Sequence, residues 1–155
     1  MVILDTNVLS ELRLTDCSPA VLAFIADTAA DHLAIAAASV SEIAYGAELL
    51  ARRGAAMADA ITAWLDALIA TYRVLPMDAS AARRLGHMLA IPALHGLALT
   101  HPGARRPKFG ADLAIAAVAV ANKAAVATRN TRDFALIAQH CPGLRVIDPF
   151  QPRTG

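Results

Sequence analysis

The chain opens with Val2-Ile3-Leu4-Asp5-Thr6-Asn7-Val8-Leu9, and this stretch decides the fold class. Val2 to Leu4 is an uninterrupted apolar run, which is typical of a strand in a parallel sheet that is buried on both faces. Asp5, Thr6 and Asn7 follow at once and are good N-cap residues for a helix that begins near Val8. The start of the chain therefore predicts a strand, a polar turn and a helix.

The same alternation of strand and helix continues to the end of the chain. Further apolar runs that suit strands are Leu33 to Ala37, Val74 to Met77, Ala124 to Ala127 and Arg145 to Ile147. Helical patterns fall between them: from Ser18-Pro19 to about Ala30, from the capping-box pattern Ser39-Val40-Ser41-Glu42 to Gly54, from Ala56 to Tyr72, from Ala79 to Ala90 behind Asp78, from Asp112 to about Asn122, and a short one from about Thr128 to Phe134. This order predicts a three-layer α/β/α fold, with helices on both faces of a central, mostly parallel sheet.

Length and composition limit the number of domains and the kind of protein that this fold belongs to. At 155 residues, with no internal repeat or linker, the chain is expected to form a single domain over residues 1–155. Its hydrophobic content is 57%, but no apolar run reaches the roughly 18 residues of a membrane span. The N-terminus has no basic segment typical of a signal peptide, so we expect a soluble, cytoplasmic protein. A net charge of +1 does not indicate a general nucleic-acid binder, and any contact with a polyanion should be local.

Four acidic residues stand where a strand ends or a helix begins: Asp5, Glu42, Asp112 and Asp133. Loops at the carboxyl ends of parallel strands lie beside one another, so these carboxylates can converge. Two carboxylates about 4 Å apart repel by roughly 4 kcal/mol at an effective dielectric constant of about 20. Either protonation or a hard divalent cation must offset that repulsion, and Mg²⁺ or Mn²⁺ suits all-oxygen ligands.

Four motifs in this order resemble those of a PIN-domain ribonuclease. They are Val2-Ile3-Leu4-Asp5-Thr6-Asn7-Val8-Leu9, Val40-Ser41-Glu42-Ile43-Ala44-Tyr45-Gly46, Asp112-Leu113-Ala114-Ile115-Ala116-Ala117 and Thr128-Arg129-Asn130-Thr131-Arg132-Asp133-Phe134. More narrowly, the chain resembles the VapC toxins, especially the FitB-like ones, from Val2 to Phe150. Each motif alone is weak, and their joint order makes the resemblance specific.

The resemblance implies a metal-dependent endoribonuclease that acts as the toxin of a toxin-antitoxin pair. Asp5, Glu42, Asp112 and Asp133 would then be the catalytic acids that hold Mg²⁺ or Mn²⁺, with Asp5 and Asp112 as the firmest ligands. RNA would be hydrolysed by a water molecule that the cation activates. Thr6, Asn7, Thr128 and Asn130 stand beside these acids and are expected to orient them.

The resemblance also implies partners. They are an RNA substrate, a second copy of the chain in a homodimer, and a small antitoxin that covers the site, giving heterotetramers or larger complexes. DNA would be bound only through the antitoxin. Arg105, Arg106 and Lys108 lie in a long loop from Pro92 to Lys108, within which Ala93 to Leu99 could form a short helix. These basic residues could contact the RNA backbone.

Structural roles could explain each acid separately. Asp5 could be only a helix cap, Glu42 only the third residue of a capping box, Asp112 a favourable charge in a first helical turn, and Asp133 a solvated turn residue. A PIN-like binding module without turnover is the main alternative function. A Mg²⁺-dependent receiver or phosphatase that uses Asp5 is a further one, but Asn7 stands where such a phosphatase usually has a second Asp.

Overall fold

The computed structural model describes residues 1–98 and 111–151 of the chain. The described strands are β1 (Val2–Leu4), β2 (Leu33–Ala36), β3 (Arg73–Leu75), β4 (Ala125–Ala127) and β5 (Arg145–Ile147). The described helices are α1 (Thr6–Glu11), α2 (Pro19–Ala26), α3 (Ala37–Ala51), α4 (Met57–Thr71), α5 (Ala79–Leu89), α6 (His95–Ala98), α7 (Ala111–Ala121) and α8 (Thr131–His140). Two short 3-10 helices, Ala30–His32 and Pro92–Leu94, complete these elements.

The strands form one sheet in the order β3-β2-β1-β4-β5, and every neighbouring pair is parallel. The chain first builds outward from β1 through β2 to β3 and then returns to the other side of β1 with β4 and β5. The direction of winding therefore changes between β1 and β4. In open parallel sheets, ligands bind beyond the carboxyl ends of the strands at such a switch point.

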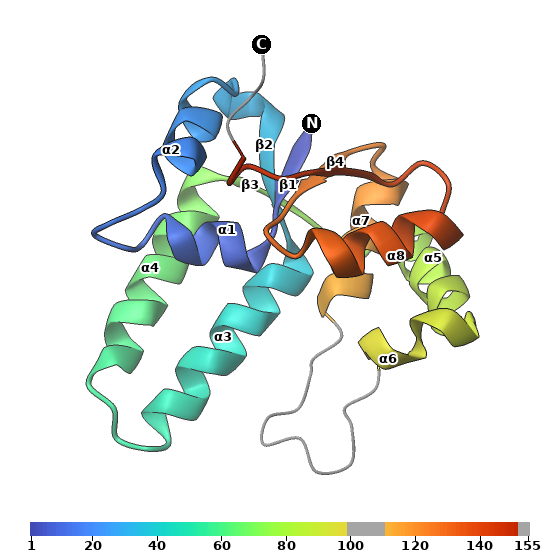
Figure 1. Cartoon of the computed structure of the whole chain (residues 1–155). Helices are drawn as coiled ribbons and strands as arrows, with labels where there is room; N and C mark the ends of the chain where they lie inside the picture. Colours follow the sequence, from blue (N-terminus) through green and yellow to red (C-terminus); the bar gives the residue numbers. More distant parts are fainter. Residues whose placement is uncertain (99–110, 152–155) are drawn as a thin grey trace.

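Helices cover both faces of the sheet, as the sequence predicts (Figure 1). On each strand, side chains alternate between the faces. Ile3 belongs to a core with residues of α5, α7 and α8, whereas its neighbour Leu4 belongs to a second core with residues of α1, α2, α3 and α4. Because both faces are covered, the strands consist almost wholly of apolar residues. The expected three-layer α/β/α fold is confirmed.

The start of α3 differs from the sequence prediction. The Ser39-Val40-Ser41-Glu42 pattern predicted a capping box, but the helix begins at Ala37, directly after β2, with Ala36 as its N-cap. Ser39 thus lies inside the helix, fully buried, and its hydroxyl has no hydrogen-bond partner in the part of the chain that the structure describes. Glu42 is one turn further into the helix than predicted, which frees its side chain from a capping role.

Other boundaries also differ from the sequence prediction. Helix α2 ends at Ala26 rather than near Ala30, and β3 covers Arg73–Leu75 rather than Val74 to Met77. The short helix expected within Ala93 to Leu99 is present as α6. Among the described residues, no helix is both long enough and apolar enough to cross a membrane.

Candidate metal centre at the carboxyl edge of the sheet

Asp5 lies at the centre of the candidate site because it directly follows β1, the middle strand of the sheet. Its carboxylate Oδ1 accepts a hydrogen bond of 2.7 Å from the backbone amide of Thr6, so Asp5 is the N-cap of α1. Its Oδ2 accepts a hydrogen bond of 2.6 Å from the Thr128 hydroxyl and another from the Asn7 side-chain amide. Both carboxylate oxygens are therefore held in place, and the residue is only 2% exposed.

Burial raises the pKa of the Asp5 carboxyl above its ordinary value of 3.8. The negative charge of Glu42 raises this pKa further, which indicates that the two carboxylates are close. Hydrogen bonds from Thr128, the Thr6 amide and Asn7 act in the opposite direction but do not cancel the effect of burial. A buried anion that is held by donors but destabilised by another anion is well suited to a cation.

Glu42 reaches the site from α3, which directly follows β2, the neighbour of β1 in the sheet. The Thr6 hydroxyl donates a hydrogen bond of 2.6 Å to Glu42 Oε2, while the Thr6 backbone amide binds Asp5. A single residue of α1 thus positions two of the four predicted acids. The prediction that Thr6 orients these acids agrees with both contacts.

Asp112 and Asp133 are held together by Asn130. The Asn130 side-chain amide donates a hydrogen bond of 3.1 Å to Asp112 Oδ2 and one of 2.9 Å to Asp133 Oδ2. Asp112 lies in the first turn of α7 and Asp133 in the first turn of α8. One amide group therefore links the starts of two helices that lie on the same face of the sheet.

Thr128 connects the two pairs of acids. Its hydroxyl oxygen accepts hydrogen bonds from the Asn130 backbone amide at 2.9 Å and from the Asn7 side-chain amide at 3.1 Å, and its proton goes to Asp5. The four acids and the four neighbouring polar residues predicted from the sequence consequently belong to one hydrogen-bond network. They come from α1, α3, α7 and α8 and from the loops after β1 and β4, and the parallel sheet brings them together.

The composition of this network fits a hard divalent cation. Its potential ligands are carboxylate and hydroxyl oxygens, which Mg²⁺ and Mn²⁺ prefer, and it contains no Cys or His. Among the described residues, no three His, Cys, Asp or Glu side chains are already grouped closely enough to hold a metal ion. Instead, Asn130 and Thr6 occupy positions between the acids, and these side chains hold the carboxylates near one another.

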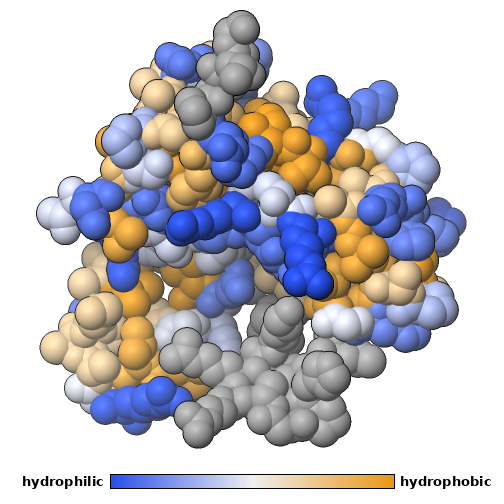
Figure 2. Space-filling view, in the orientation of Figure 1, coloured by the Kyte–Doolittle hydropathy of each residue, from blue (hydrophilic) through white to orange (hydrophobic). Residues whose placement is uncertain are grey.

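Sequence reasoning selected three basic residues for RNA contact, and the structure describes two further arginines beside the acids. Arg105, Arg106 and Lys108 lie outside the described residues. Two exposed arginines, Arg129 and Arg132, stand within the Thr128 to Asp133 segment itself. Figure 2 shows hydrophilic side chains gathered in the middle of the face that is also viewed in Figure 1, over α1 and the beginning of α8. The sequence did contain a signal for these arginines, because both lie within the Thr128 to Phe134 motif. Only the acidic and polar residues of that motif were predicted to belong to the site.

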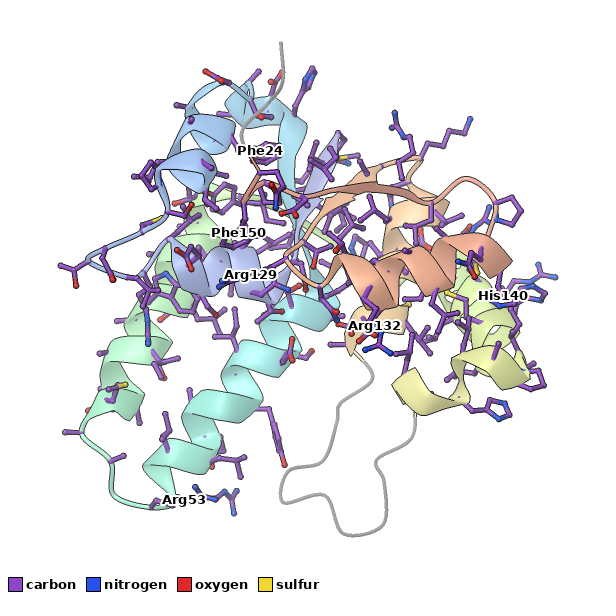
Figure 3. The ribbon with its side chains drawn as sticks, viewed as in Figure 1. Phe24, Arg53, Arg129, Arg132, His140 and Phe150 are labelled. Atoms are coloured by element: carbon purple, nitrogen blue, oxygen red, sulfur yellow. The ribbon has the colours of Figure 1, made fainter. Side chains whose placement is uncertain are left out.

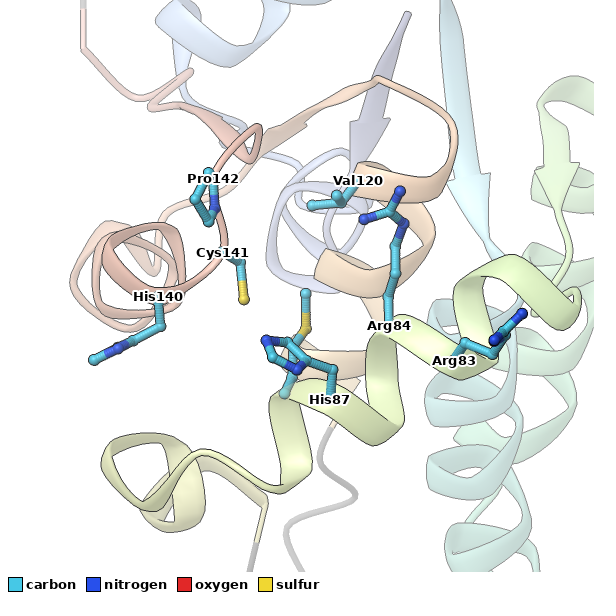
Figure 4. A pocket seen from close by; sticks show the side chains of 8 residues that line it. Arg83, Arg84, His87, Val120, His140, Cys141 and Pro142 are labelled. Carbon is cyan, nitrogen blue, oxygen red and sulfur yellow. The ribbon is translucent and has the colours of Figure 1, made fainter.

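A surface hollow of about 360 Å³ lies elsewhere, between α5 and the carboxyl ends of α7 and α8 (Figure 4). Its lining includes Arg84, His87 and Cys141 but no carboxylate. It is at the opposite end of α7 from Asp112. We therefore assign the candidate chemistry to the acidic network and not to the hollow.

Comparisons with known proteins agree with this geometry. The model of the PIN domain matches residues 2–139 of the chain. The chain belongs to the PIN-domain family. This family assignment covers all four acids, from Asp5 to Asp133, and confirms the resemblance identified in the four sequence motifs.

Individual known proteins resemble the chain over nearly its whole length. A VapC ribonuclease of Sinorhizobium fredii is 32% identical, over 98% of this chain and 99% of the relative. The plasmid stability protein StbB of Pseudomonas syringae pv. tomato is 31% identical, over 97% of this chain and 99% of the relative. The crystal structure of FitAcB from Neisseria gonorrhoeae matches with a TM-score of 0.73 and 25% identity, over 97% of this chain and 99% of that one.

Proposed function

We propose that this PIN-domain protein is the toxin of a toxin-antitoxin pair and that it hydrolyses RNA phosphodiester bonds with the help of Mg²⁺ or Mn²⁺. The observation that carries the proposal is the single hydrogen-bond network that joins Asp5, Glu42, Asp112 and Asp133 at the switch point of the sheet. The relative from S. fredii is a VapC ribonuclease, which supports a nuclease. The plasmid stability protein and the FitAcB structure support a toxin-antitoxin setting.

In this proposal the four acids are the catalytic set, with Asp5 and Asp112 as the firmest metal ligands. A bound divalent cation lowers the pKa of the attacking water and neutralises the charge that develops on the phosphate oxygens. Asp5 is buried and accepts three hydrogen bonds, so its oxygens stay in one orientation. The products would carry a 5′-phosphate and a 3′-hydroxyl. No covalent intermediate on the protein is required.

Thr6, Asn7, Thr128 and Asn130 orient the acids in this proposal. Asn130 is the most important of them because it holds both Asp112 and Asp133. Residues that orient metal ligands typically change metal affinity or activity by about 10- to 100-fold when they are replaced. Their contribution should therefore be measurable separately from that of the acids.

The alternative functions are less well supported. A phosphatase that uses Asp5 as its nucleophile usually has a second Asp at the position of Asn7, and Asn7 here donates a hydrogen bond to Asp5 instead. A binding module without turnover would have no need for four acids in one network. That alternative nevertheless makes a clear prediction, which is RNA binding without metal-dependent cleavage.

The direct test is cleavage of a mixture of structured RNAs by the purified protein. We expect cutting in Mg²⁺ or Mn²⁺, no cutting in EDTA, and loss of cutting in the Asp112→Asn variant. Asp66→Asn is the matched control, because Asp66 is an exposed acid on α4 outside the network. Metal-independent cleavage, or equal activity of both variants, would contradict the proposal, and binding without cleavage would favour the module.

The toxin role has its own test. The chain should arrest growth when it is expressed alone, and a short reading frame directly upstream should encode a protein that binds it and relieves the arrest. We also propose that the protein acts in the cytoplasm as a homodimer that this antitoxin inhibits. An Asp112→Asn variant that still arrests growth would show that the arrest does not come from cleavage.

A further inference from the structure

Arg129 lies between two residues of the acidic network, Thr128 and Asn130. Its backbone amide donates a hydrogen bond of 2.9 Å to the side-chain oxygen of Asn7, and the side-chain nitrogen of Asn7 donates to Asp5. The main chain at Arg129 is therefore fixed within two hydrogen bonds of the central acid. Its side chain, in contrast, is exposed to solvent.

The side chain of Arg129 is nevertheless held in one direction. Its guanidinium carbon lies 4.8 Å from the centroid of the Phe150 ring (Figure 3). Phe150 comes from the segment after β5, where its backbone amide donates to Asp148 Oδ1 at 3.0 Å. Phe150 also packs against the core that contains Leu4 and Val8. The end of the chain thus returns to the site and supports Arg129.

Among the described residues, no acceptor engages the N–H donors of the Arg129 side chain. A ring stacks on the flat face of a guanidinium, whereas the N–H donors point outward in the plane of the group. Arg129 forms no salt bridge with any acid among the described residues, where the one ion pair joins Arg52 and Glu48. The causes of the raised Asp5 pKa likewise include no cation. Arg129 therefore stands beside the acids without neutralising them.

An oriented guanidinium with free donors suits a phosphate, which it can bind through two parallel hydrogen bonds. We infer that Arg129 positions the RNA substrate by binding a phosphate adjacent to the scissile phosphate. Phe150 holds the Arg129 guanidinium in the orientation that this contact requires. The inference rests on the proposed function, because it assumes that RNA is the substrate. It adds a substrate contact outside the acidic network and a role for the chain after β5.

The first test is RNA binding in EDTA, so that cleavage does not interfere. Fluorescence anisotropy with a short single-stranded RNA is measured at several salt concentrations for the wild type, Arg129→Ala and Arg73→Ala. Arg73 is the matched control because it is an exposed arginine at the amino end of β3. Loss of one phosphate contact should reduce the slope of log affinity against log salt by about 0.7 in Arg129→Ala only.

The second test separates substrate positioning from damage to the site. With metal present, Arg129→Ala should lower kcat/KM about 10- to 100-fold, as expected for the loss of one hydrogen-bonded charge, while Mn²⁺ affinity stays at the wild-type value. Arg129→Lys should recover the charge but not the two-point contact, and so only part of the rate. Phe150→Leu should keep the packing and remove the ring face, giving a smaller loss in kcat/KM.

The outcomes distinguish this inference from the proposed function. If the wild type cuts RNA and Arg129→Ala matches it in both salt slope and kcat/KM, the inference is wrong and the proposed function stands. If Mn²⁺ affinity falls together with kcat/KM, Arg129 supports the acidic network and does not bind RNA. If the wild type binds RNA with an Arg129-dependent slope but does not cut it, the proposed nuclease is wrong and the RNA contact remains. No binding of RNA by the wild type would overturn both.

Discussion

The Thr128 hydroxyl donates a hydrogen bond of 2.6 Å to Asp5 Oδ2, although the two residues are 123 positions apart in the sequence. They follow β4 and β1, which are neighbours in the sheet, and the contact lies where the direction of winding changes. Thr128 also accepts from Asn130, which holds Asp112 and Asp133. This pair therefore joins the two halves of the acidic network.

Asp5 should make the stability of the metal-free protein depend on pH. Burial raises its pKa from the ordinary value of 3.8, so the folded state binds the proton more tightly than the unfolded state does. The free energy of unfolding should therefore fall as pH rises from about 4 through the raised pKa. At neutral pH the carboxyl is ionised, and the whole of this loss in stability should be present. Asp5→Asn should remove this component in urea unfolding series in EDTA.

The matched control for Asp5 is Asp78→Asn. Asp78 is also an N-cap, accepting a hydrogen bond of 2.8 Å from the Ala81 amide, but it is exposed. Its replacement should change stability by about 1 kcal/mol or less without removing the decline with pH. Protons should also compete with Mn²⁺ for Asp5, so metal affinity should weaken as pH falls. Identical pH profiles for the wild type and Asp5→Asn would contradict the prediction.

Thr6 should control metal affinity through its hydroxyl, which donates to Glu42 Oε2 at 2.6 Å. Thr6→Val keeps the shape of the side chain and the backbone contact with Asp5 but removes this donor. We expect Mn²⁺ affinity to fall about 10- to 100-fold, measured by calorimetric titration. Thr6→Ser retains the hydroxyl and should remain close to the wild type. Equal affinities for the Val and Ser variants would show that Glu42 needs no such support.

Asn130 should act mainly by holding two carboxylates in the absence of metal. Asn130→Asp replaces the shared donor with a third anion and should reduce the free energy of unfolding in EDTA by about 1–3 kcal/mol. Mn²⁺ should restore much of this loss, because the cation offsets the repulsion. Asn122→Asp is the control, since Asn122 also donates a side-chain hydrogen bond, to the Val118 carbonyl, at the other end of α7. A metal-dependent recovery in both variants would count against a specific role for Asn130.

Ser39 should be a site at which a smaller, apolar residue increases stability. Its hydroxyl is fully buried in α3 and has no partner among the described residues, which is unfavourable by about 1–3 kcal/mol compared with a satisfied group. We expect Ser39→Ala to raise the free energy of unfolding by about 1 kcal/mol. Ser41→Ala is the control, because it gains the same helix propensity while its exposed hydroxyl already donates to the Ala37 carbonyl at 3.1 Å. The difference between the two variants in urea unfolding measures the cost of the buried hydroxyl.

Local patterns in the sequence were sufficient for most of the fold. The apolar run of Val2 to Leu4 forms β1, and the stripe from Ala56 to Tyr72 forms α4, because strands buried on both faces and amphipathic helices have distinct periods. The start of α3 could not be predicted in the same way. Ser39 and Glu42 match a capping box locally, but β2 delivers the chain directly into the helix at Ala37, and burial of Ser39 overrides the local preference.

The candidate site likewise has features that local sequence determines and features that only tertiary contacts determine. The sequence by itself determined which acids stand at the ends of strands and the beginnings of helices, because capping and burial patterns are local. Capping patterns alone do not distinguish Asp5 from Asp78, since both are N-caps and both follow a strand, and only the motif resemblance selected Asp5. Only the tertiary structure buries Asp5, joins it to Thr128 and Glu42, and brings Phe150 over Arg129. The physical reason is that burial and long-range hydrogen bonds depend on which strands are neighbours, and the order of strands in the sheet differs from their order in the chain.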